Sequence, residues 1–155
     1  MITKMMKMTL MIAAAAFLTV AVAGAAENSD LPAPIKAVYG HYLEIQSSLA
    51  KDSMTGISKN AAAITKAVKS DASALPAAVG IQAERLAKAQ DLKTARAAFK
   101  PLSDSLIRYL TVHHVKDAYV EVYCPMAKAS WLQVGKTVSN PYMGKAMPDC
   151  GEIRN

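Results

Sequence analysis

The sequence predicts a mainly α-helical protein, an antiparallel four-helix bundle closed by a small C-terminal β-hairpin and an irregular loop. Two observations lead to this fold class. From residue 31 to about residue 114, apolar residues recur at steps of three and four, which is the period of a helix with one buried face. After His114 they alternate, which is the period of a strand. Four amphipathic segments joined by short connections favour an antiparallel bundle.

The first three helices are delimited by apolar stripes and by the turn-forming stretches between them. Pro34 suits a first helical turn, where its missing N–H group is not needed, and Asp30 can cap that helix. The stretches "KDSMTG" and "KSDAS" separate the stripes. The stripes consist of Ile35, Val38, Tyr42, Ile45 and Leu49, then Ile57, Ala61, Ile64 and Val68, then Leu75, Val79, Gln82 and Leu86. His41 lies outside the first stripe, so we expect it to be exposed to solvent.

The fourth helix has the most regular pattern. Asp91 can cap its start, and the stripe that follows keeps strictly to steps of three and four. Its members are Leu92, Ala95, Phe99, Leu102, Leu106, Tyr109 and His113. Leu102 and Leu106 should therefore be buried. Pro101 lies inside this helix and removes one backbone donor, so we expect a kink or a division near Lys100.

The C-terminal segment changes from a helical to a strand-like pattern. The stretch "DAYVEVYC" alternates and predicts a strand, with "SWLQVG" as its partner and "PMAKA" as the turn between them. The stretches "NPYMG" and "MPDCG" predict further turns, because they contain residues that turns favour. We therefore expect a hairpin followed by an irregular loop.

The N-terminus has the layout of a secretory signal peptide. Lys4 and Lys7 give a positive start, and the apolar run "TLMIAAAAFLTVAV" follows. Small residues come next and offer cleavage sites at Ala21–Ala23 or Ala23–Ala25. The apolar run is short for a membrane span. The sequence therefore predicts export, with membrane contact only through the cleaved signal peptide.

This division leaves one domain after the signal peptide. Residues 1–26 form the predicted signal peptide, and residues 27–155 form a single helical domain with a tail that contains cysteine and methionine. A chain of this length can bury one hydrophobic core. We expect the exported protein to be periplasmic.

Charge and motifs argue against two classes of function. The formal net charge is +6, but the lysines are scattered without a basic run or interleaved aromatic residues, so nucleic-acid binding is not expected. The sequence contains no Gly-rich phosphate loop, no G-x-S-x-G, no H-E-x-x-H and no C-x-x-C. We therefore do not expect an enzyme.

The sulfur-containing residues of the tail are the candidate site. Thiolate and thioether ligands prefer Cu(I) to harder ions. The candidate metal ligands are Cys124, Met126, Met147 and Cys150, with Met143 and His113 in reserve. The alternative is a structural disulfide between Cys124 and Cys150, which an exported protein can keep. Its closed loop would stabilise the fold by about 3.5 kcal/mol in the chain-entropy model.

Two further groups of residues have simpler interpretations. His113 lies on the fourth stripe near the end of its helix, where a positively charged histidine interacts favourably with the helix dipole, and ligation is the alternative. Trp131, Tyr123 and Tyr142 are predicted to form the core of the tail, because aromatic rings bury large areas.

The tail also resembles a known family. The motifs "YCPMA", "WLQ", "NPYMG" and "CG" occur in this order near the C-terminus and are similar to those of the domain-of-unknown-function 3347 family. We expect this resemblance to extend from about Leu31 to Ile153, with the tail as its specific part. The residues that match the family motifs are Cys124, Pro125, Met126, Asn140, Pro141, Tyr142, Gly144, Met147, Cys150 and Gly151. Two features depart from the family pattern. Met143 stands where the family usually has an aromatic residue, and the segment from Met126 to Trp131 is shorter than expected for the family.

The resemblance implies a role near metal efflux. Members of the family are small exported domains that occur alone or appended to adaptor proteins of heavy-metal efflux pumps. The leading hypothesis is therefore a periplasmic protein that binds Cu(I) or Ag(I) and serves metal tolerance or delivery. A heavy-metal efflux adaptor or another envelope protein would be its partner. The alternative is a disulfide-stapled helical interaction module of the cell envelope that binds no metal.

Overall fold

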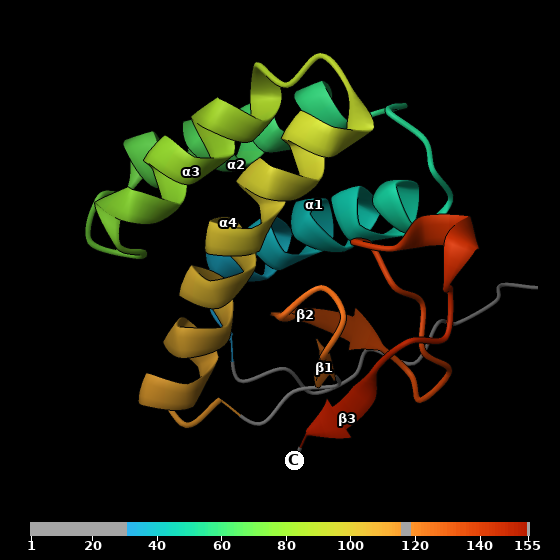
Figure 1. Ribbon diagram of the computed structural model, residues 1–155. Coiled ribbons are helices and arrows are strands. Elements are labelled where there is room, and N and C mark those ends of the chain that lie inside the picture. Colours follow the sequence, from blue (N-terminus) through green and yellow to red (C-terminus); the bar gives the residue numbers. More distant parts are fainter. Residues whose placement is uncertain (1–30, 116–118, 155) are drawn as a thin grey trace, which may run out of the picture.

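The computed structural model describes residues 31–115 and 119–154. The helices are α1 (Ala33–Ala50), α2 (Ile57–Ser70), α3 (Ala77–Ala87) and α4 (Leu92–Val112). The strands are β1 (Tyr119–Cys124), β2 (Ala129–Val134) and β3 (Glu152–Arg154), and a short 3-10 helix, η1 (Gly144–Ala146), lies between β2 and β3. The described part of the protein is thus mainly helical, with one small antiparallel sheet beside the helices (Figure 1).

The helices begin where the sequence indicates. Pro34 occupies the first turn of α1, whereas the proposed cap Asp30 lies outside the described residues. Asp91 caps α4, because its carboxylate accepts a hydrogen bond of 2.8 Å from the Thr94 N–H group while the Thr94 hydroxyl faces the Asp91 N–H group. This is a capping box, which satisfies backbone donors that the helix itself leaves unpaired.

Helix α4 continues through Pro101, so of the two expected outcomes, a kink or a division near Lys100, the division does not occur. Its axis changes direction midway (Figure 1). Proline in a helix removes one hydrogen bond and crowds the preceding turn, which a bend can relieve without ending the helix. The residues before and after the proline keep their apolar faces on the core.

The helical stripes form the core. Leu102 and Leu106 are fully buried, as predicted, and so are most members of the other stripes. In α3 the buried residues are Val79, Gly80, Ala83 and Leu86, whereas Gln82 is only half-buried. Gly80 lets α3 approach α2, because a Cβ atom there would lie 3.2 Å from a Val68 methyl group.

Each helix packs against the next along the chain, and α1 and α4 also contact β2. Contacts between α1 and α4 themselves are few, so the packing does not confirm the finer expectation of an antiparallel four-helix bundle. His41 is half-buried rather than exposed, because α2 lies against α1 and places the Asn60 side-chain oxygen 2.9 Å from the His41 ring. No helix within residues 31–115 and 119–154 is long and apolar enough to cross a membrane.

The two strands anticipated in the tail pair antiparallel, with Val122 opposite Trp131 and Cys124 opposite Ala129. The sheet order is β2-β1-β3, so a third strand replaces part of the expected irregular loop. All three residues of β3 are exposed, with Ile153 paired opposite Val122. A three-residue exposed strand leaves no alternation in burial, which explains why the sequence pattern did not reveal it.

The sheet is covered on both faces. On one face Tyr119 stacks on Tyr39 of α1, with ring centroids 5.1 Å apart. On the other face, Gly151 approaches Val122 and Trp131 so closely that a Cβ atom would lie 2.6 Å and 2.8 Å from them. The C-terminal segment therefore lies over the face of β1 that carries Val122 and, because strand side chains alternate, Cys124.

Two tyrosine hydroxyls form hydrogen bonds with backbone groups on the outer edge of β2. The Tyr42 hydroxyl accepts a 3.0 Å hydrogen bond from the Leu132 N–H group, and the Tyr142 hydroxyl donates one of 2.8 Å to the Ser130 carbonyl. Unpaired strand edges tend to associate with other strands. The hydroxyls join this edge to α1 and to the C-terminal segment instead.

One prediction concerns the backbone of α1. Gly40 is exposed within the helix, and a Cβ atom there would meet nothing within 4 Å. Gly40→Ala should therefore raise the free energy of unfolding by about 0.5–1 kcal/mol, because alanine loses less conformational entropy than glycine on forming a helix. Urea denaturation measures the change. Gly80→Ala is the matched control and should show no such gain, since Val68 is in the way.

Candidate functional site

Two cysteines from distant parts of the tail lie side by side. Cys124 ends β1 and is fully buried, whereas Cys150 immediately precedes Gly151 and β3 and is half-buried. Both are free thiols, and their side chains share a hydrogen bond. The antiparallel pairing of β1 with β3 explains the contact, because it returns the C-terminus to the end of β1.

The surroundings favour negative charge on Cys124. Burial raises the pKa of its thiol, but hydrogen bonds from Cys150, from backbone N–H groups and from the Asn140 side chain outweigh burial and leave the pKa lowered. The Ala127 N–H group donates to the Cys124 sulfur at 3.4 Å, and the Met126 N–H group contributes as well. The turn "PMAK" thus aims backbone donors at this sulfur.

Cys150 has the opposite tendency. Its hydrogen bond to Cys124 raises the pKa of the Cys150 thiol, and burial raises it further. The Ala127 N–H group that points at the Cys124 sulfur favours Cys124 as the acceptor in this pair, and Cys150 is the more accessible of the two thiols.

Asn140 holds the two cysteine segments together. It is fully buried, and its side-chain oxygen accepts hydrogen bonds of 2.8 Å and 2.9 Å from the N–H groups of Tyr142 and Met143. Its side-chain N–H₂ group donates to the Cys150 carbonyl and to the Cys124 sulfur. Its backbone N–H group donates to the Pro148 carbonyl at 2.9 Å. From the sequence, Asn140 was read only as a turn residue.

The stretch "NPYMG" is also clamped to the helices. Arg96 of α4 donates to the Pro141 carbonyl at 2.8 Å and to the Leu49 carbonyl at 2.9 Å, and it forms an ion pair with Asp52. Asp52 in turn accepts a 3.1 Å hydrogen bond from the N–H group of Lys145. The guanidinium of Arg96 lowers the pKa of the Asp52 carboxyl. Sequence reasoning missed Arg96 and Asp52, since no local pattern connects them to the tail.

The aromatic residues of the tail form a packed layer behind the cysteines. Trp131 is fully buried, and its ring lies edge-on to Tyr142 with centroids 6.0 Å apart. Tyr142 also packs on Phe99 of α4 at 5.8 Å. The Trp131 N–H group donates to the Gln133 side chain at 3.1 Å. Tyr123 is half-buried and lies under the Arg154 guanidinium. Trp131 and Tyr142 therefore fix the loop that carries Asn140.

The remaining candidate ligands differ in exposure. Met126 lies in the turn between β1 and β2, with 66% of its side chain exposed. Met143 is half-buried against the core, and Met147 is half-buried with its carbonyl 3.4 Å from the Cys150 nitrogen. His113 is exposed at the end of α4, where its ring packs on Tyr109 at 4.2 Å. Cys124 is the last residue of β1, whereas His113 precedes this strand in the chain.

Within residues 31–115 and 119–154, no group of three or more His, Cys, Asp or Glu side chains is arranged to hold a metal ion. In this part of the chain, the ligands that the site offers are therefore the two thiols and the thioethers near them in sequence. Thiolates and thioethers are soft ligands.

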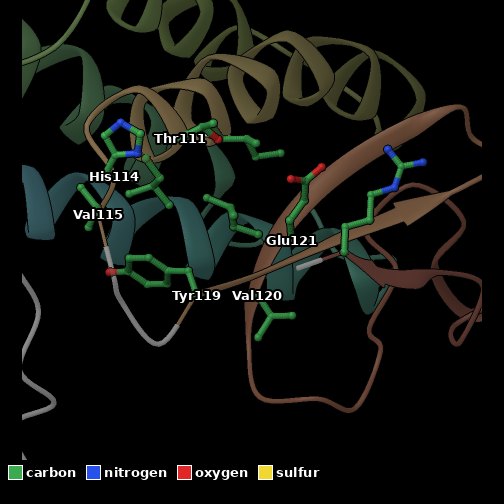
Figure 2. Close-up of a pocket in the computed structure, with 10 residues that line it drawn as sticks. Thr111, His114, Val115, Tyr119, Val120 and Glu121 are labelled. Atoms are coloured by element: carbon green, nitrogen blue, oxygen red, sulfur yellow. Dashed lines mark hydrogen bonds between the residues drawn. The ribbon is translucent and has the colours of Figure 1, made fainter.

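A groove of about 460 Å³ lies apart from the thiols (Figure 2). Ile107 and Leu110 of α4 form one wall, and Glu121 points from β1 toward that helix. Arg154 faces Glu121 in the strand register, but its guanidinium stacks on the Tyr123 ring at 3.9 Å, and no ion pair joins it to Glu121 among the described residues. Because strand side chains alternate, Glu121 lies on the face of β1 opposite to Cys124.

The fold and the site define a small, mainly helical protein whose C-terminal sheet and loop bring two thiols together. The family model described as "Protein of unknown function (DUF3347)" matches residues 38–118, about half of the chain. The protein belongs to this family. No curated protein and no solved structure matches the chain.

The matched range corrects one expectation. The sequence motifs suggested that the tail would be the specific part of the likeness, but the match covers the helices and ends just before β1. The cysteines and the stretch "NPYMG" lie outside it. Family membership therefore rests on the helical part of the chain.

Proposed function

We propose that this protein is an exported, periplasmic binding protein for a soft metal ion, Cu(I) or Ag(I), that serves metal tolerance or delivery. The thiolates of Cys124 and Cys150 would be the principal ligands. The observation that carries the proposal is the contact between these two free thiols. Cys124 ends β1 and Cys150 lies just before β3, and the buried Asn140 side chain interacts with both segments.

The local chemistry suits a soft ion better than a hard one. Mg²⁺ and Ca²⁺ require several oxygen ligands. Structural Zn²⁺ sites usually have four ligands from Cys, His, Asp or Glu. A pair of thiolates, with thioethers near them in sequence, matches the preference of Cu(I) and Ag(I) for sulfur. Met147 is the proposed supporting thioether, and its backbone carbonyl bonds to the Cys150 N–H group, which joins the two residues in one turn.

Met126 would contribute from the solvent side. Its backbone N–H group faces both cysteine sulfurs, yet its side chain is mostly exposed. It can therefore reach an incoming ion before the buried Cys124. Met143 and His113 remain reserve ligands, with the Met143 side chain packed against the core. The proposal assigns the protein binding, not catalysis, and an envelope protein such as a heavy-metal efflux adaptor as its partner.

The decisive experiment is a competition titration of reduced protein against a Cu(I) chelator. We expect one Cu(I) per chain, and we expect binding to release protons because thiols must deprotonate to bind metal. Cys124→Ser and Cys150→Ser should each abolish binding. Met147→Leu keeps the side-chain volume and should weaken binding far more than it lowers stability, while His113→Ala should matter less than either serine variant. The proposal is wrong if the reduced protein takes no Cu(I), or if both serine variants bind as much as the unmodified protein.

The same thiol contact favours a second candidate, a disulfide-stapled interaction module without metal. A disulfide between Cys124 and Cys150 would tie β1 to the segment before β3. Counting free thiols in protein isolated from the periplasm separates the two candidates. Two free thiols favour the metal site, and none favours the staple.

A further inference from the structure

The charge of the metal complex distinguishes the ions that this site could hold. Two thiolates and one singly charged cation give a complex of charge −1, whereas two thiolates and a doubly charged cation give a neutral complex. A buried net charge requires hydrogen-bond donors around it. The arrangement of donors at the sulfurs therefore bears on which class of cation binds.

The Cys124 sulfur is surrounded by N–H donors. The Ala127 N–H group donates to it at 3.4 Å, and the Asn140 N–H₂ group, which donates to the Cys150 carbonyl, acts on it together with the Met126 N–H group and lowers the pKa of its thiol. Asp149, which is exposed and adjacent to Cys150 in sequence, is an acidic side chain that acts on Cys150. Among residues 31–115 and 119–154, no carboxylate forms a hydrogen bond with the Cys124 sulfur.

The orientation of the Asn140 amide is settled by its partners. Backbone N–H groups of Tyr142 and Met143 point at one side-chain atom, which must be the oxygen because N–H groups require an acceptor. The N–H₂ group is therefore the part that faces Cys150 and Cys124. Asn140 is thus a fully buried side chain whose N–H₂ group acts on both cysteine segments.

From this geometry we infer that Asn140 determines the charge class of the ligand, making the two-thiol site selective for a singly charged soft cation. The inference rests on the proposed function. Asn140 acts through the sulfurs as a positioning and specificity-determining residue. Its N–H₂ group offsets the net negative charge that only a complex with a singly charged ion retains.

The variant Asn140→Asp tests this directly. Aspartate has nearly the same shape and keeps the acceptor for Tyr142 and Met143, but it replaces the donor at the sulfurs with a negative charge. Affinities for Ag(I) and Cd²⁺ are measured by competition titration on reduced protein at mildly alkaline pH. The ratio of Ag(I) to Cd²⁺ affinity should fall by at least about tenfold, because like charges within hydrogen-bonding reach repel strongly in a partly buried site.

Arg96→Lys is the matched control. It removes hydrogen bonds to the Pro141 and Leu49 carbonyls but leaves the charge near the sulfurs unchanged. Loosening the loop in this way should change both affinities by the same factor. Asn140→Ser, which removes the donor without adding charge, serves as a second variant if Asn140→Asp does not fold, and it should lower the ratio less but in the same direction.

The outcomes separate the two proposals. A ratio that stays constant in both Asn140 variants would overturn the inference and leave Asn140 with a structural role only. An unmodified protein that binds neither Ag(I) nor Cu(I) would instead refute the proposed function. A fall in the ratio that Arg96→Lys reproduces would assign the effect to the loop as a whole, which also overturns the inference.

Discussion

Leu106→Ala should lower the free energy of unfolding by about 2–5 kcal/mol, the usual range for truncating a buried leucine. Leu106 is fully buried in the centre of α4, and its backbone carbonyl accepts a 2.7 Å hydrogen bond from the Tyr39 hydroxyl. The truncation leaves that hydrogen bond in place but opens a cavity between α4, α1 and the sheet. Urea denaturation followed by circular dichroism measures the loss.

Two substitutions on the same helix are controls. Lys93→Ala and Val112→Ala replace exposed side chains, and 64% of the Val112 side chain is accessible. Each should change the free energy of unfolding by less than about 0.5 kcal/mol. Equal losses for Leu106→Ala and Lys93→Ala would show that the buried face of α4 is wrongly assigned.

The helices could be predicted because their signals are local. The apolar period, the capping residues and the turn-forming breaks of a helix are each visible within a few residues of sequence. The capping box at Asp91 and the burial of Leu102 confirm two of the predictions made from them. The packing of the helices against one another could not be predicted in this way. A stripe shows that a face is buried but not which helix covers it, so neither the contact of His41 with Asn60 nor the few contacts between α1 and α4 could be read from the chain.

The sheet was predictable only in part. The strands β1 and β2 alternate in sequence and are joined by a short turn, so their pattern is visible. The third strand pairs with β1 from far along the chain and exposes all three of its residues. At Pro101 the sequence predicted a kink or a division, and the helix continues because residues on both sides of the proline pack in the core.

The candidate site, too, could be predicted from the sequence only in part. The chemistry of the cysteines and methionines is visible in the sequence because these residue types are rare in the chain. Their geometry depends on Asn140, Arg96 and Asp52, which meet through contacts between segments far apart in sequence. No spacing rule connects Arg96 with the tail, so only the fold reveals the clamp.

Gly144→Ala should lower the free energy of unfolding by about 2–5 kcal/mol, from a backbone and a steric contribution. About 1–2 kcal/mol comes from the backbone, because Gly144 has φ +55°, a left-handed conformation that disfavours side chains. A further ~1–3 kcal/mol comes from overpacking. The new Cβ atom would overlap the Asp52 carboxyl group and a side-chain nitrogen of Arg96, so these side chains must shift.

Gly135→Ala isolates the backbone contribution to this loss. Gly135 has φ +79°, but a Cβ atom there would meet nothing within 4 Å, so its substitution should cost only about 1–2 kcal/mol. The steric part is tested by a double-mutant cycle with Asp52→Ala, which removes the carboxylate that the Cβ atom would strike. In that background Gly144→Ala should cost less than in the unmodified protein, and any remaining excess over Gly135→Ala reports the overlap of the Cβ atom with Arg96. If Gly144→Ala alone already costs no more than Gly135→Ala, Gly144 does not pack tightly against the Arg96–Asp52 ion pair. Asn140 must then hold the cysteine segments without help from the helices.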